Sequence, residues 1–264
     1  MHTPVTFPLV AGGLVKRYGR GSSQVTAVAD ASLRVRAGEI VGIHGSSGSG
    51  KSTLLRLLAG VERPTAGTVR LQVGTAVPWV WSGEAPSAHP SAIFARVAGR
   101  SVHRGQRPHP APGVVMPILQ DPVGSLDPRW PIWRSITEPL TAPHRPRRPA
   151  RSERREFAAR QLATVGLQGI DLDALPGELS RGQCQRVAIL RALAAEPAVV
   201  LADEPTSALD VSVSAGILHL LAGIAERGAA LVVVSHDLPM LDALCHRLLP
   251  MHAGHLGRGE GDTA

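Results

Sequence analysis

The sequence predicts an α/β fold, and two patterns in the second half of the chain carry this prediction. Fully apolar runs at 198–202 and 229–234 are typical of strands buried in a covered parallel sheet. Around them, apolar side chains recur every three or four positions, as they do on helices that cover such a sheet. The chain has 264 residues, 44% of them hydrophobic, so it is long enough to bury one large core or two modest ones.

The N-terminal part of the chain predicts strands around a single helix. The stretches with strand-like patterns are 14–18, 25–35, 40–43 and 65–71. A helix that begins near Lys51 is expected to stop at Gly60, because glycine readily takes the left-handed conformation that follows a helix.

A long irregular segment is predicted from Gln72 to Pro117, because prolines interrupt it throughout. Only 91–97 could form a short helix there, and Trp79 and Trp81 could hold the start of the segment to the body of the protein. The segment also contains three histidines: His89, His103 and His109. A metal-sensing role is one interpretation of them, and Pro/His-rich disorder is the favoured one.

Helices are expected in four stretches of the second half: 153–165, 180–196, 211–224 and 238–245. Gly166 ends the first of them and Pro197 the second. The second also begins with a capping box, in which Ser180 and Gln183 satisfy each other's backbone amides.

The segment 45–53 reads G-S-S-G-S-G-K-S-T and lies between an apolar strand and a helical pattern. This is the context of a phosphate-binding P-loop, whose backbone N–H groups hold the α- and β-phosphates next to the positive end of the helix dipole. Lys51 can reach the β- and γ-phosphates, and the Ser52 hydroxyl can bind Mg²⁺. The predicted binding residues are Gly45, Ser46, Ser47, Gly48, Ser49, Gly50, Lys51, Ser52 and Thr53. The sequence therefore predicts binding of a nucleoside triphosphate.

Two acidic residues, Asp203 and Glu204, end the apolar strand that begins at 198. If that strand lies beside the P-loop strand, Asp203 can hold Mg²⁺ directly or through water. Glu204 then faces the phosphates and can act as general base for a water, which contributes roughly 10²- to 10⁴-fold in rate. Taken alone, the two residues could equally be solvated loop residues.

At Leu179–Gln183 the chain reads L-S-R-G-Q, which resembles the L-S-G-G-Q signature of ATP-binding cassette ATPases. The resemblance covers nearly the whole chain and implies one ATPase domain over 1–264. Its expected fold is a P-loop NTPase (RecA-like) core with an N-terminal antiparallel β-subdomain and an inserted α-helical subdomain. The implied boundaries are 1–120 and 197–264 for the core with the β-subdomain, about 121–196 for the helical subdomain and about 72–117 for the irregular insertion.

The resemblance also implies that the signature of one subunit binds ATP held by another. Its contact residues are Ser180, Arg181, Gly182 and Gln183. A second cassette, identical or not, would then complete each ATP site. Arg181 departs from the family pattern, because it replaces the first signature glycine. A cation there opposes the helix dipole by about 0.3–1 kcal/mol, although the partner's phosphate could offset this.

Four further residues match family positions and so take roles from the resemblance. Tyr18, the only tyrosine, matches the aromatic residue that stacks on adenine, although a core strand residue is the alternative. Gln120 matches the glutamine that senses Mg²⁺ and the lytic water. Asp210 matches the residue that communicates across the dimer, and His236 matches the histidine that contacts the γ-phosphate. With Lys51 and Glu204, Gln120 and His236 are the expected catalytic residues; Ser52, Gln120 and Asp203 are the expected Mg²⁺ ligands.

The segments 119–129 and 204–213 are similar to the cassettes of dipeptide, oligopeptide and nickel importers. This similarity implies an import complex with two permease subunits, an extracytoplasmic binding protein and often a second, non-identical cassette. Because the chain stops soon after Leu256, it looks more like the shorter nickel-type members. Two other interpretations stay open: an attenuated or regulatory subunit, which Arg181 favours, and a nucleic-acid-associated cassette protein. The second cassette or long coiled-coil insertion that the latter usually carries is not found here, so no nucleic acid is expected.

Charge and composition favour a cytosolic bacterial protein. The net charge of +7 comes almost wholly from arginine, since Lys16 and Lys51 are the only lysines, a bias typical of a G+C-rich genome. The arginine-rich run 145–155 reads as a solvated segment or as a contact with anionic lipid heads. Cys184 and Cys245 are expected as reduced thiols. No apolar run is long enough to span a membrane, so the expected place is the cytoplasmic face of the plasma membrane, as a peripheral subunit.

Overall fold

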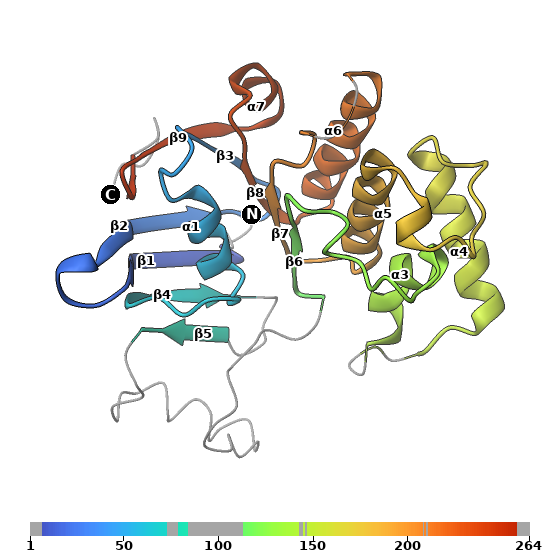
Figure 1. Cartoon of the computed structure of the whole chain (residues 1–264), viewed down its shortest axis with the longest axis horizontal. Coiled ribbons are helices and arrows are strands. Elements are labelled where there is room, and N and C mark those ends of the chain that lie inside the picture. The colour runs from blue at the N-terminus through green and yellow to red at the C-terminus, as the bar shows by residue number, and fades with distance from the viewer. Residues whose placement is uncertain are drawn as a thin grey trace, which may run out of the picture.

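The computed structural model describes residues 7–72, 79–83, 113–142, 145, 147–207, 209 and 211–257. These residues form two sheets with helices around them (Figure 1). An antiparallel sheet lies at one end of the molecule, and a group of helices lies at the opposite end, with the second sheet between them.

The antiparallel sheet has four strands in the order β2-β1-β4-β5. The strands are β1 (Leu9–Tyr18), β2 (Val25–Val35), β4 (Ala66–Leu71) and β5 (Trp79–Ser82). Strand β5 shows that the prediction of irregular structure is wrong at its position, because 79–82 pair with 68–71 of β4. Trp81 holds this strand to the body as expected: it is buried, and its Nε1 donates to the carbonyl of Leu57 at 2.8 Å.

The predicted helix at 91–97 and the histidines His89, His103 and His109 lie outside the described residues. The end of the predicted irregular segment is also wrong, because 115–117 belong to strand β6 of the second sheet.

The second sheet has six strands in the order β10-β9-β3-β8-β7-β6. Its strands are β3 (Ile40–His44), β6 (Val115–Ile118), β7 (Val199–Asp203), β8 (Ala230–Val234), β9 (Arg247–His252) and β10 (His255–Leu256). All pairs but β9–β10 are parallel. The expectation that Asp203 ends a strand beside the P-loop strand is wrong, because β8 lies between β3 and β7. Strand β8 pairs with β3 on one edge and with β7 on the other, and every residue of this apolar strand is buried.

The helix at 132–136 was not predicted, whereas the other described α-helices match the sequence prediction to within a few residues. The helices are α1 (Lys51–Leu58), α3 (Ile132–Ile136), α4 (Arg151–Thr164), α5 (Arg181–Ala194), α6 (Val211–Glu226) and α7 (Leu238–Leu244), with short 3₁₀ turns at Gly21–Ser23, Glu138–Thr141 and Pro176–Glu178. Gly60 follows α1 with φ +69°, as expected of a residue that ends a helix.

Two hydrophobic cores lie on opposite faces of the six-stranded sheet. Alternate residues of β7 point to each: Val199 and Leu201 pack toward α1 and the antiparallel sheet, whereas Val200 and Ala202 pack toward α3, α5 and α6. A strand that is buried on both faces has no polar alternation, which is why the sequence predicts it as a covered strand. Its carboxyl end brings Asp203 to the edge of the sheet where β3 also ends.

Both cysteines are free thiols, as predicted: Cys184 is buried and Cys245 is half-buried. Burial raises the pKa of both, and that of Cys245 to about 12. In the part of the chain that the structure describes, we find no helix with the length and apolar character needed to cross a membrane.

Candidate active site

The loop from β3 to α1 is closely packed against two other backbone segments. Gly45 has φ +156°, and a Cβ there would lie 2.1 Å from the carbonyl oxygen of Met251. Gly50 has φ +106°, in the left-handed region, and its Cβ would lie 2.1 Å from the carbonyl oxygen of Ala27. Only glycine fits either position, so these two residues fix the path of the loop.

The loop leaves donors available for an anion. No side chain caps the first turn of α1, and 46–48 are exposed. Lys51 folds back over the loop, where its Nζ donates to the carbonyls of Gly45 and Ser46, each at 2.8 Å. An anion bound to the free amides would offer this ammonium a charged acceptor in place of two neutral ones.

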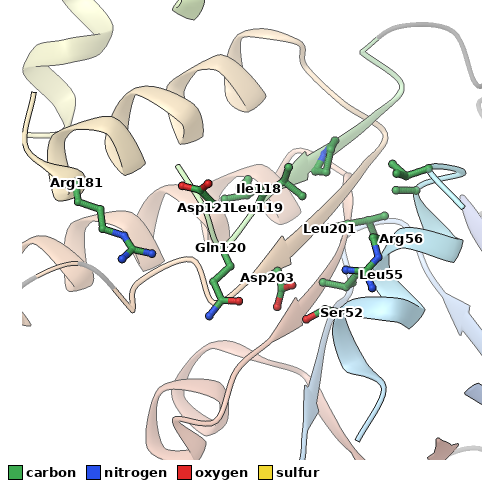
Figure 2. Close-up of a pocket in the computed structure, with 13 residues that line it drawn as sticks. Ser52, Leu55, Arg56, Ile118, Leu119, Gln120, Asp121, Arg181, Leu201 and Asp203 are labelled. Atoms are coloured by element: carbon green, nitrogen blue, oxygen red, sulfur yellow. The ribbon is translucent and has the colours of Figure 1, made fainter. Parts of the chain in front are cut away.

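Asp203 lies close to Ser52 of α1, although β8 separates β7 from β3, the strand that leads into α1, and Figure 2 shows the two side chains pointing toward each other. Burial raises the pKa of Asp203 against the opposing effect of a hydrogen bond from Ser52, and the charge of Glu204 raises it further. Two neighbouring carboxylates and a hydroxyl are oxygen ligands that fit Mg²⁺, whose charge would relieve this repulsion. Among the described residues no three His, Cys, Asp or Glu side chains gather as ligands. These oxygen atoms therefore fit a Mg²⁺ ion whose other ligands would be phosphate and water.

Glu204 is held by the two residues that follow β8. Its Oε2 accepts from the Ser235 hydroxyl at 3.1 Å, and its Oε1 accepts from the His236 amide at 3.1 Å and lies 2.8 Å from His236 Nδ1. The Glu204 side chain is 12% exposed, whereas that of His236 is 76% exposed. The hydrogen bond and the negative charge of Glu204 raise the pKa of His236. The structure thus brings together two predicted catalytic residues from different strands.

Glu204 also has a strained backbone, with φ +50°. Its amide donates to the carbonyl of Val234 at 2.9 Å, which holds the turn that follows β7. A non-glycine residue in the left-handed region costs of order 1–3 kcal/mol and is typical of functional turns. The sequence analysis missed Ser235, although its place between a buried strand and His236 is a usable signal.

Tyr18 ends β1 and belongs to a charged cluster that reaches the P-loop helix. Its hydroxyl donates to Glu62 at 2.5 Å, and Arg56 of α1 bonds both Glu62 at 2.8 Å and the Thr53 hydroxyl at 3.2 Å. Although burial alone would raise the pKa of Glu62, the bonds from Tyr18 and Arg56 lower it. Tyr18 is 39% exposed, so it is not a core residue, and Lys16 Nζ lies 5.1 Å from the centre of its ring. Stacking of this ring on adenine stays a prediction.

A groove of about 500 Å³ separates α1 and β7 from the start of α5. Gln120 and Asp121 line it from the segment after β6, Ser52 and Asp203 line its floor, and Arg181 enters from α5 (Figure 2). The structure therefore places Gln120, a predicted ligand and catalytic residue, on the same groove as Ser52 and Asp203, the other two predicted ligands.

The signature segment has the predicted capping box. Gln183 N–H donates to the Ser180 hydroxyl at 3.3 Å, and Ser180 N–H donates to the Gln183 side chain at 2.8 Å. Arg181 is the first residue of α5 and is exposed. Ser180, Gly182 and Gln183 do not line the groove, and Asp210 lies outside the described residues.

A glycine loop before a helix, a carboxylate facing its serine and a held glutamate define an α/β nucleotide-binding protein of the P-loop class. The family model described as "ABC transporter" matches residues 28–207. The chain therefore belongs to the ABC transporter family of ATP-binding cassettes. A dimeric ATP-binding cassette solved with ADP and inorganic phosphate has 28% identity and a TM-score of 0.74, over 97% of this chain and 99% of that one. This likeness confirms the predicted fold.

Curated relatives include transport proteins of bacteria. The Escherichia coli protein named "Probable D,D-dipeptide transport ATP-binding protein DdpF" is 36% identical over 90% of this chain, and the oligopeptide transport ATP-binding protein OppD of Mycobacterium tuberculosis is 37% identical over 96%. The methionine import ATP-binding protein MetN of Latilactobacillus sakei is 37% identical over 91%. The chain spans 65%, 36% and 61% of the lengths of these relatives, respectively.

Proposed function

We propose that this chain binds and hydrolyses MgATP to power import of a small solute, of the peptide class, through separate permease subunits. The observation that carries the proposal is the Glu204 carboxylate, which Ser235 and His236 hold beside the Asp203–Ser52 pair. A held, partly buried carboxylate next to a magnesium-type ligand set is the arrangement that activates water for attack on a phosphate. The names of the relatives support peptides over nickel as the cargo class.

In the proposed reaction each of these side chains has one task. Ser52 and Asp203 would hold Mg²⁺, which would supply positive charge against the phosphates. Lys51 exchanges its hydrogen bonds to the carbonyls of Gly45 and Ser46 for bonds to the phosphates. Gln120 lines the groove together with Ser52 and Asp203. Glu204 takes the proton of the attacking water as the new oxygen–phosphorus bond forms and the bond to the β-phosphate oxygen breaks, which releases ADP.

The proposed partners of this chain are a second cassette and the permease subunits. We propose that Ser180–Gln183 of a second cassette, identical or not, closes over the ATP, as the dimeric solved relative suggests. The groove, with the exposed side chains of Val61 and Leu119 at its wall, is the proposed contact of the permeases. We propose that 121–196 moves as a helical subdomain when the two cassettes close, and that this movement is passed to the permease subunits. The cassettes would then be peripheral subunits on the cytoplasmic face of the membrane.

Replacing Glu204 by Gln tests the function directly. The amide keeps the shape of the side chain but removes the base, so we expect steady-state ATP hydrolysis to fall by roughly 10²-fold or more while ATP stays bound. Glu226→Gln, at the exposed end of α6, is the matched control and should leave both unchanged. Hydrolysis that survives in the Glu204→Gln protein would show that the base is another group.

A further inference from the structure

A cluster of arginines lies on α3, on α4 and on the segment before α4, at the end of the molecule far from the antiparallel sheet. Arg134 of α3 lies over the Trp130 ring at 4.0 Å, and Arg154 and Arg151 of α4 lie 4.9 and 5.5 Å from the ring centre of Trp133. Figure 1 shows α3 and α4 side by side at that end of the molecule. We call the set of Arg134, Arg148, Arg151 and Arg154 the arginine face.

The carboxylates near this face are already engaged by other arginines. Glu153 accepts from Arg147 at 2.7 and 3.0 Å. Asp173 accepts two bonds from Arg155 at 2.6 and 2.8 Å. Among the described residues, the four members of the arginine face form no ion pair with a carboxylate. The arginine-rich run of the sequence thus divides into a neutralised part and a part that joins Arg134 to make a cationic surface.

This arrangement is unfavourable in the absence of an anion. The Nε atom of Arg154 is buried without a hydrogen-bond partner. Burial lowers the pKa of Arg154, and the charges of Arg148, Arg134 and Arg151 lower it further. Mutual repulsion among cations from two helices and a preceding segment would be relieved by a multivalent anion that contacts all of them.

We propose that the arginine face binds the phosphates of anionic phospholipid headgroups. Guanidinium groups match phosphate geometry with paired donors, and the half-buried Trp130 ring beside Arg134 is the kind of amphipathic group found at membrane interfaces. The described large apolar side chains that are exposed lie outside α3 and α4, so the face lacks the apolar centre of a protein interface. A charged, extended ligand such as a lipid surface therefore fits it better than an acidic peptide.

The test is co-sedimentation of the full chain, without nucleotide, with vesicles of phosphatidylcholine or of phosphatidylcholine with about 30% phosphatidylglycerol. We expect binding only to the anionic vesicles, and we expect Arg148→Gln with Arg151→Gln to weaken it about 25-fold, or roughly fivefold for each cation. Both side chains are exposed, so the double variant should fold. Its thermal unfolding should match that of the wild type.

The matched control is Arg160→Gln with Arg227→Gln, which removes the same charge from two other exposed positions. The control should retain wild-type binding. Equal losses in the two double variants would mean general attraction by the net charge and would overturn the proposal. Failure of the wild type to bind anionic vesicles would also overturn the proposal. Release of the protein from the vesicles by inorganic phosphate, but not by chloride at equal ionic strength, would overturn it as well, because it would indicate a site for a soluble anion.

Discussion

At the scale of single residues, the pairing of Glu204 with His236 is what turns two sequence matches into a site. The sequence places each residue directly after an apolar strand, which predicts that they meet at one edge of a parallel sheet. It does not predict the left-handed backbone of Glu204 or the bond from Ser235, because both depend on how β8 is inserted between β3 and β7.

The same pair makes stability depend on pH. Glu204 raises the pKa of His236 above its ordinary value of 6.5, so the pair stabilises the fold fully below about pH 6.5 and this contribution is lost as the pH rises through the raised pKa. We expect His236→Ala to lower Tm by about 1–2 °C at pH 6 and by less at pH 9; the effect is small because the His236 side chain is exposed and solvent screens its charge. Differential scanning calorimetry across this range measures the change. A difference in Tm between the variant and the wild type that grows with pH would contradict the assignment.

At the scale of elements, the P-loop is held by glycine contacts as much as by the helix behind it. Gly50→Ala would place a methyl group 2.1 Å from the Ala27 carbonyl oxygen in a left-handed conformation. We expect the free energy of unfolding, measured in urea without nucleotide, to fall by at least about 2 kcal/mol. Gly12→Ala in β1 is the control, because its Cβ meets no atom within 4 Å and its φ is not left-handed. Equal stability of the two variants would show that the loop can move away from β2.

The elements that sequence analysis found are those with a local signal. A few adjacent residues are enough to predict the capping box of Ser180 and Gln183, the end of α1 at Gly60 and the covered strand β7. Strand β9 was missed because Pro250 and a mixed apolar pattern hide it, and β5 was missed because its partner, β4, supplies the reason for it to be extended. The position of β8 between β3 and β7 is a property of the whole sheet, so no local pattern shows it.

At the scale of the whole molecule, the charges of the chain are arranged in ways that the sequence does not show. The arginine-rich run is contiguous in sequence, yet Arg145 and Arg147 pair with Glu196 and Glu153, whereas Arg148, before α4, and Arg134, of α3, both act on Arg154 through their charges. Arg181 stands at the edge of the groove with Gln120, at the start of α5. Part of the arginine-rich run is thus neutralised, and the rest contributes to the arginine face at the helical end of the molecule.

Arg181 allows the proposed dimer to be tested separately from folding. In the Glu204→Gln background, which is expected to retain ATP, we expect ATP-dependent dimers by light scattering. We expect Arg181→Glu to abolish them, because in the proposed dimer it would place a negative charge against the partner's γ-phosphate. The same change should stabilise the fold slightly, by about 0.3–1 kcal/mol, because an acidic residue at the start of α5 favours the helix dipole. ATP affinity of the monomer should stay unchanged. Arg160→Glu on α4 alters the charge equally and should leave dimerisation intact. If Arg181→Glu dimerises as well as that control, the signature of one chain does not meet the ATP of the other.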